Sequence, residues 1–195
     1  MEKTYRQSPL NFKGKRRDYV LQIISRLYEI PRTGWVDRKV NSPETVGEHT
    51  AELIDLANHF YPFTPGLNRM LKIHDWPESA KGLGDIRTDH FCPTDHRWTK
   101  AEKYEAEFTA MRQICANLGL AGKNILNLWL EFEEGKTERA DLARQLDKFQ
   151  AIKKALYYQK KGEPVKAQEF WEVDGAKIKN PELIKVLEKH GLIFK

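Results

Sequence analysis

Residues 67–78 read LNRMLKIHDWPE, and in this stretch an apolar helix face runs directly into two ionisable side chains. Four residues share that face at the i, i+3, i+4 and i+7 positions: Leu67, Met70, Leu71 and His74. Asp75 follows at once, and Pro77 predicts that the helix ends near Trp76. Because a buried carboxylate is unfavourable unless it is paired or binds a metal, the His-Asp doublet needs a partner.

A second inward histidine lies in the preceding helical segment. Ser42 is a good N-cap and Pro43 suits the first helical position, so we expect that helix to begin there. Its apolar face holds His49 together with Val46, Leu53 and Phe60. Taken alone, such a histidine is more often a core residue that bonds a backbone carbonyl, and this alternative stays open.

An inward carboxylate recurs much further along the chain, in a long helix expected over residues 137–161. Asp147 lies beside Leu146 and along a stripe of small side chains formed by Ala140, Ala143 and Ala151. The same aspartate could instead cap a turn or pair with Arg144 or Lys148. Neither alternative can be excluded from this segment by itself.

Two inward imidazoles and two inward carboxylates on three helices could satisfy one another around a single cation. The four residues are His49, His74, Asp75 and Asp147. Mixed nitrogen and oxygen donors suit Zn, Fe, Ni, Mn and Co, and they argue against a dedicated Ca site. Sequence spacing alone does not bring the four together, because only a fold can do so.

The rest of the chain also predicts helices. A first helix should end before Pro31, others should lie on either side of Gly119, and a last one should open at Asn180-Pro181. Residues 81–97 are rich in Gly, Asp, Thr and Pro, which predicts a long loop. With no alternating strand pattern and no internal repeat, we expect an all-α fold with a single domain over 18–195.

Composition sets broad limits on the protein. Of its 195 residues, 40% are apolar and 31% are charged, as in an ordinary globular domain, and no apolar run nears the ~20 residues of a membrane span. The first residues lack the apolar core of a secretory signal. The two cysteines have no CxxC spacing, which argues against a disulfide framework or a thiolate metal site. A cytoplasmic protein with no membrane attachment is therefore expected.

The net charge of +5 owes much to a basic N-terminal arm over residues 1–17. Such an arm can bind nucleic acid, but no aromatic-basic interleaving follows it, so we interpret it as a solvated terminus. A mild positive field suits a small anionic substrate. Lys100 and Lys103 could neutralise a phosphate, although a charged exposed helix face is the simpler interpretation.

Five motifs in order resemble those of the HD-domain phosphohydrolases, in the branch that contains the 5'-deoxynucleotidases. They are PRTGW at 31–35, PETVGEHT at 43–50, HDWPE at 74–78, GDI at 84–86 and RQLDKFQA at 144–151. The resemblance covers roughly residues 18–188. It implies a helical bundle, commonly a homodimer, that removes phosphate from deoxynucleoside 5'-monophosphates.

The resemblance also implies one divalent transition metal, Co, Mn or a similar ion such as Zn, Ni or Fe, with Mg as a further candidate. Its ligands would be His49, His74, Asp75 and Asp147. Such a cation acts as a Lewis acid on phosphoryl oxygens and lowers the pKa of a bound water.

Four further residues take roles from the resemblance, each beside a simpler alternative. Glu78 would orient or deprotonate the attacking water, or protonate the leaving 5'-oxygen, unless it faces solvent after Pro77. Arg32 would bind the phosphate with its guanidinium fork, unless it is merely solvated. Trp35 would wall the sugar pocket or lie in the core. Asp85 would bond the sugar 3'-hydroxyl or simply make a turn.

Two other classes of function are alternatives to a 5'-deoxynucleotidase: another hydrolase of the same fold, and a non-catalytic binding protein. A deoxynucleoside triphosphate hydrolase or a phosphodiesterase would use the same fold, and a triphosphate should require more basic residues than Arg32 alone. A non-catalytic nucleotide-binding sensor would lack a ligand, and none of the four is missing. Two departures from the family pattern, a longer HDWPESAKGLGD stretch and the spacing between Arg32 and Trp35, leave sugar and base selectivity open.

Overall fold

The computed structural model describes residues 13–88 and 98–192, and within these ranges the elements are helices with no sheet. The all-α prediction is therefore confirmed. In chain order the elements are α1 (Lys15–Leu27), α2 (Thr33–Val36), α3 (Val46–Phe60), α4 (Leu67–Ile73), η1 (Trp76–Ser79), α5 (Lys100–Leu118), α6 (Leu120–Glu134), α7 (Glu138–Lys160), α8 (Ala167–Asp174), η2 (Gly175–Lys177) and α9 (Pro181–Glu188).

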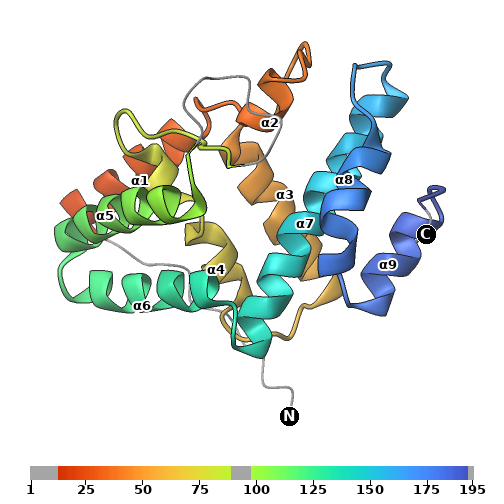
Figure 1. The fold of residues 1–195 in the computed structure, drawn as a ribbon. Coiled ribbons are helices and arrows are strands. Elements are labelled where there is room, and N and C mark those ends of the chain that lie inside the picture. The colour runs from red at the N-terminus through yellow and green to blue at the C-terminus, as the bar shows by residue number, and fades with distance from the viewer. Residues whose placement is uncertain (1–12, 89–97, 193–195) are drawn as a thin grey trace.

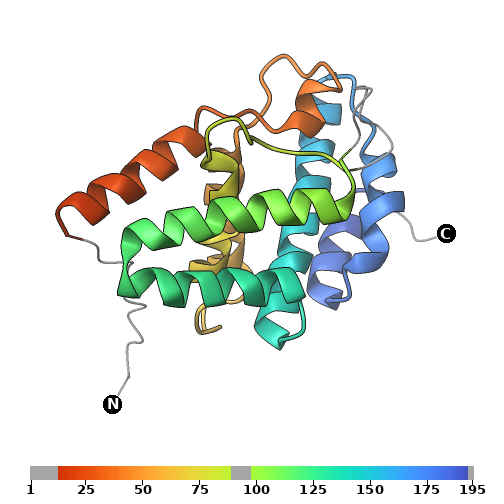
Figure 2. The ribbon, with the colours of Figure 1, turned by 60° about the vertical axis from the view of Figure 1, so that its left-hand side comes forward.

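The helices surround two buried apolar clusters that meet at α3 and α4. One cluster joins α3, α4 and α7 to α8 and α9, and the other joins α1, η1, α5 and α6. Figure 1 shows α1, α5 and α6 on one side of α3 and α4, with α8 and α9 on the other. The paired helices α5 and α6 lie alongside each other in Figure 2. The seam between the clusters is where the inward polar side chains lie.

Helix α3 begins three residues later than the sequence predicted. Its N-cap is Thr45, whose side chain accepts from the backbone N–H of Glu48 at 3.2 Å while Glu48 bonds back to the N–H of Thr45 at 2.8 Å. The prediction of Ser42 and Pro43 as the helix start was wrong because this part of the chain runs extended beside residues 30–32. The N–H of Arg32 donates to the carbonyl of Glu44, and an isolated bridge pairs Pro31 with Thr45. The pairing places Arg32 beside the start of α3.

Several other boundaries follow the sequence. Asn180 caps α9 by accepting from the N–H of Glu182 at 2.9 Å, and Gly119 separates α5 from α6. Helix α1 begins at Lys15, so the last three residues of the expected basic arm are helical. The expected loop begins with turns and runs as far as Thr88, and residues 89–97 lie outside the described ranges. Among the helices described, none combines the length and the apolar character needed to cross a membrane.

Candidate metal centre

The four predicted ligands converge from three helices. His49 lies fully buried on α3, His74 and Asp75 end α4, and Asp147 lies midway along α7. One side-chain donor atom each from His49, His74 and Asp147 lies within 4.8 Å of the others. Asp75 completes the group, with its Oδ2 atom 3.0 Å from His74 Nε2 and 3.8 Å from His49 Nε2. Residues that are distant in sequence thus form one cluster at the seam of the core.

The histidine rings are arranged as metal ligands usually are. His74 Nδ1 donates to the backbone carbonyl of Leu71 at 2.7 Å, which leaves its Nε2 with a lone pair. His49 Nδ1 lies 2.7 Å from the side-chain oxygen of Gln150. Both Nε2 atoms are buried, and neither has a hydrogen-bond partner among the residues that the structure describes. Each Nε2 atom nevertheless lies near a carboxylate oxygen. His49 Nε2 is 3.2 Å from Asp147 Oδ1 and His74 Nε2 is 3.0 Å from Asp75 Oδ2, but neither contact is a hydrogen bond.

The two aspartates stay ionised although their side chains are only 17% (Asp75) and 16% (Asp147) exposed. Burial raises the pKa of the Asp75 carboxyl, but His74, His49 and Arg32 outweigh it and hold that pKa below its ordinary value. The pKa of Asp147 is also well below its ordinary range, because Lys148 and His49 overcome the opposing effect of burial. Two imidazole nitrogens with two carboxylates fit a divalent transition cation.

Glu78 has the opposite electrostatic environment. It is 5% exposed on η1, and its Oε2 atom lacks a hydrogen-bond partner within the described ranges. Burial, followed by the charges of Asp75 and Asp85, raises the pKa of Glu78 well above its ordinary value. The predicted solvent-facing alternative is therefore excluded. Neighbouring carboxyl groups with pKa values driven apart are the arrangement from which acid and base roles arise.

Arg32 faces the ligand cluster from the N-cap position of α2. Burial lowers its pKa, but Asp85, Asp147, Asp75 and Glu44 together outweigh this effect and keep the pKa above the ordinary value. Its guanidinium makes no hydrogen bond or ion pair with any residue in the described part of the chain. A cationic fork held near the cluster without a bonded partner is suited to an anionic ligand.

Trp35 and Asp85 both have protein partners. Trp35 is 2% exposed, donates from Nε1 to Glu44 Oε1 at 2.9 Å and stacks on Phe170 with ring centroids 4.9 Å apart. Asp85 Oδ2 accepts from the N–H of Thr33 at 2.7 Å, and its carbonyl accepts from the Thr33 hydroxyl at 2.7 Å. These contacts resemble the core and turn alternatives more than direct substrate contacts, and the roles of both residues toward a sugar stay predictions.

A cavity of about 700 Å³ opens beside the ligands and is lined by His74, Asp75 and Asp147. Six basic side chains also line it: Lys100, Lys103, Arg144, Lys148, Lys177 and Lys179. Its volume lies in the range of small-molecule sites. Three further acidic side chains line it as well, Glu107, Glu133 and Asp141, so basic groups that could meet a phosphate lie beside the candidate metal centre within a lining of mixed charge.

Lys103 is a cavity residue that the sequence interpretation placed on an exposed face. It donates to the carbonyl of Ile86 at 2.9 Å and pairs with Glu107 at 3.3 Å. Burial raises the pKa of Glu107 to about 7, although Lys103 opposes that shift. The i, i+4 spacing of the pair was visible in the sequence, but only the fold shows that it faces the cavity.

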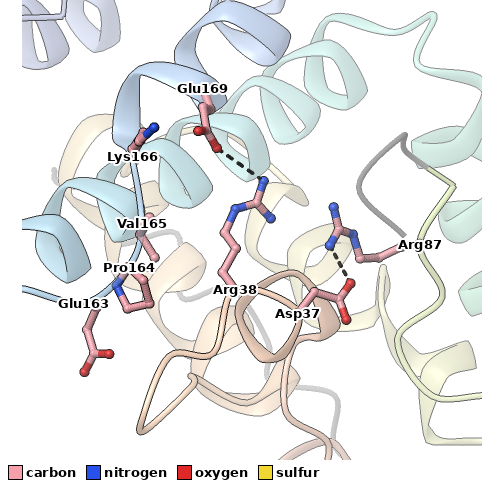
Figure 3. A pocket seen from close by; sticks show the side chains of 8 residues that line it. All are labelled: Asp37, Arg38, Arg87, Glu163, Pro164, Val165, Lys166 and Glu169. Atoms are coloured by element: carbon pink, nitrogen blue, oxygen red, sulfur yellow. Dashed lines mark hydrogen bonds and ion pairs between the residues drawn. The ribbon is translucent and has the colours of Figure 1, made fainter. Parts of the chain in front are cut away.

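A second pocket, of about 530 Å³, lies between the end of α2 and the segment that leads into α8, with Asp37, Arg38 and Glu169 among its lining residues. Figure 3 shows Arg87 reaching to Asp37 and Arg38 reaching toward Glu169. The Arg87 Nη1–Asp37 Oδ2 distance is 2.6 Å, and the Arg38–Glu169 distance is 3.9 Å. With the Thr33–Asp85 bonds, the Arg87–Asp37 pair ties the segment after Gly84 to α2. These contacts fix the position of α2, whose N-cap residue is Arg32.

Comparison with known families agrees with this geometry. The family model described as "HD domain" matches residues 24–184, which span most of the chain. The chain belongs to the HD domain family. The family predicted from the five motifs is thus confirmed, and the His74-Asp75 doublet that follows α4 is the doublet after which the family is named.

Two relatives illustrate how far this HD domain resembles characterised proteins. The 5'-deoxynucleotidase HDDC2 of Danio rerio is 33% identical over 174 residues, covering 86% of this chain and 82% of that protein. The 5'-deoxynucleotidase hdd1 of Schizosaccharomyces pombe is 34% identical over 166 residues, covering 77% of each chain.

Solved structures share the same fold. A conserved hypothetical protein from Pyrococcus furiosus superposes with a TM-score of 0.67 at 22% identity, covering 91% of this chain and 99% of that one. A predicted metal-dependent phosphohydrolase from Magnetospirillum magnetotacticum gives a TM-score of 0.61 at 18% identity, covering 92% and 97%. At these identities the likeness supports the fold of the HD domain alone.

Proposed function

We propose that this protein is a metal-dependent 5'-deoxynucleotidase, which hydrolyses deoxynucleoside 5'-monophosphates to a deoxynucleoside and phosphate. The observation that carries the proposal is the His-Asp cluster beside a cavity that six basic side chains help to line, with Glu78 and Arg32 next to the cluster. The 5'-deoxynucleotidase relatives, which align over most of the chain, supply the substrate class.

One divalent transition cation would be held by His49, His74, Asp75 and Asp147. When bound, it supplies Lewis-acid chemistry to a phosphoryl group and acidifies water. Cobalt or manganese is the proposed ion, with Zn, Ni, Fe or Mg as alternatives, since the donors are nitrogen and carboxylate oxygen. The carboxylates of Asp75 and Asp147 are already ionised, as binding requires. Burial lowers the pKa of His74, but Asp75 and Asp147 outweigh it and raise that pKa, so the cation competes with a proton for His74 Nε2.

The side chains around the cluster have separate tasks. Arg32 binds the phosphoryl oxygens and holds the scissile P–O bond over the ligands. Burial and the nearby aspartates raise the pKa of Glu78, which favours its protonated form, and in the proposed reaction that carboxyl donates its proton to the leaving 5'-oxygen. Asp85 keeps the start of α2, and with it Arg32, in position through Thr33.

A triphosphate hydrolase is the second candidate, because six basic residues line the cavity. Four of them are already engaged: Lys103 with Glu107, Lys148 with Asp147, Lys177 with Asp174, and Arg144 with backbone carbonyls of α6. The surplus positive charge is therefore small, and this favours a monophosphate. The family resemblance further supports a homodimer, which light scattering of the purified protein tests directly; the cytoplasmic location stays a prediction from the sequence.

The function is tested with metal-stripped protein on matched deoxy- and ribonucleoside 5'-monophosphates and deoxynucleoside triphosphates, with Co, Mn or Mg restored. We expect cation-dependent phosphate release from the deoxy monophosphates. Products from the triphosphates are identified by chromatography, because a phosphate assay misses pyrophosphate and tripolyphosphate. Turnover of triphosphates alone would replace the proposed substrate, whereas a metal-loaded protein inactive on the whole panel would favour a sensor.

Replacing Arg32 with lysine should lower kcat/KM for a deoxynucleoside monophosphate by roughly 10–100-fold, the equivalent of one charge-assisted hydrogen bond. Lysine retains the positive charge but loses the bidentate fork. Metal affinity should be unchanged, since Arg32 is not a ligand. Steady-state kinetics beside a metal titration measures both quantities, and an unchanged kcat/KM would remove Arg32 from the phosphate site.

A further inference from the structure

A buried amide stands directly behind the ligand His49. Gln150 lies on α7, one turn beyond Asp147, and is 0% exposed. Its side-chain oxygen is 2.7 Å from His49 Nδ1, the ring nitrogen that faces away from the other ligands' donor atoms. Gln150 therefore touches the metal centre only through the ring of His49.

The orientation of this amide is fixed from its other side. Its nitrogen donates to Glu44 Oε2 at 3.0 Å and to Glu52 Oε2 at 3.1 Å. Ionised carboxylates only accept hydrogen bonds, so the NH₂ group must face both glutamates and the carbonyl oxygen must face His49. A flipped amide would set oxygen against two carboxylates.

Both glutamates are held as acceptors by donors of their own. Burial raises the pKa of Glu52, but bonds from Lys153 and Lys154 outweigh it and lower the pKa to about 2. Glu44 is 4% exposed, accepts from the Trp35 indole at 2.9 Å and lies 3.1 Å from the ammonium of Lys154. The two lysines and the Trp35 indole thus hold the glutamates that orient the Gln150 amide.

The tautomer of His49 follows from this chain of contacts. A carbonyl oxygen can only accept, so His49 Nδ1 carries a proton, and in the neutral ring its Nε2 then carries the lone pair. In the other tautomer an N–H at Nε2 would point at Asp147, 3.2 Å away, and would block coordination.

We propose that Gln150 is a positioning residue for the metal: its amide, oriented by Glu44 and Glu52, fixes the ring and tautomer of His49 so that Nε2 binds the cation. The inference rests on the metal centre of the proposed function and adds a determinant of metal affinity to it. It also links that centre to α2, because Glu44 bonds both Gln150 and Trp35.

The first test compares Gln150→Leu with wild type in a chelator-competition titration of Co²⁺ and Zn²⁺ into metal-stripped protein. Leucine has a similar size but accepts no hydrogen bond, so affinity should fall by roughly 10–100-fold. Gln159→Leu is the matched control, because Gln159 lies exposed on the same helix and its side chain accepts from the backbone N–H of Ala167; this variant should bind as wild type does. Equal affinity for wild type and a folded Gln150→Leu protein overturns the proposal and leaves the proposed function standing.

The second test needs no variant. In wild-type protein labelled with ¹⁵N-histidine and loaded with diamagnetic Zn²⁺, long-range ¹H–¹⁵N spectra should show His49 protonated at Nδ1 and coordinated through Nε2. Coordination through Nδ1 contradicts the proposal even if Gln150→Leu fails to fold. A wild type that binds none of the cations overturns the inference together with the proposed function.

Discussion

An Asp147→Asn protein is expected to lose about a thousandfold or more in kcat/KM for a deoxynucleoside monophosphate. The amide removes the ligand charge while keeping the shape of the side chain. It also leaves Lys148, 3.0 Å from Asp147 Oδ2, facing the cluster without its carboxylate partner. A Lewis-acid contribution of several kcal/mol corresponds to about that factor, since each 1.4 kcal/mol changes a rate tenfold.

Two measurements separate this effect from general damage. Calorimetric titration of the stripped protein should show much weaker Co²⁺ binding by Asp147→Asn, while its circular dichroism remains helical. Asp55→Asn, an exposed change on α3, is the matched control and should keep both activity and affinity. Full activity of Asp147→Asn at ordinary cobalt concentrations would remove Asp147 from the ligand set.

Glu78→Gln should lower kcat by roughly 10²–10⁴-fold, the usual contribution of a general acid or base, and leave metal affinity nearly unchanged. Glutamine retains the shape of Glu78 but cannot transfer a proton. The part of the pH profile of kcat that reflects titration of Glu78 should be absent from the variant. A glutamine protein with wild-type kcat would show that the proton comes from elsewhere.

The same substitution should not cost stability. Because the folded-state pKa of Glu78 is raised, the folded chain binds more protons than the unfolded chain above the ordinary glutamate pKa, and wild-type stability falls as pH rises. The amide has no such dependence. Thermal melts of the metal-stripped proteins should therefore give Glu78→Gln a Tm equal to or above that of wild type, with the difference growing toward alkaline pH.

The sequence predicted the candidate ligands because they break the apolar pattern of their helices. His49 and His74 occupy positions that periodicity assigns to the core, and both are buried there. Asp147 follows Leu146 on a helix whose small inward residues let α3 and α4 approach α7. Periodicity identifies inward faces, and the ordered motifs indicated which inward faces meet.

The start of α3 and the contacts of Gln150 were not predicted from the sequence, because both depend on contacts between segments that are distant in the chain. Thr45 and Glu48 form a capping box that was readable three residues apart, but the Ser42-Pro43 signal precedes it and the extended pairing with residues 30–32 decides between them. Gln150 carried no periodic signal, since its importance lies in Glu44 and Glu52, about a hundred residues away. Contacts of that range depend on how helices pack, which a single sequence does not state.

The convergence of ligands from α3, α4 and α7 also concerns the unfolded chain. A cation held by His49 and Asp147 would close a loop of about half the polypeptide, an arrangement that the denatured ensemble cannot form without a large loss of conformational entropy. Binding energy therefore adds to folding energy, by an amount set by the free cation concentration. If the proposed ligands hold the cation, metal supply would affect how often the chain opens to proteases, as well as how fast it turns over substrate.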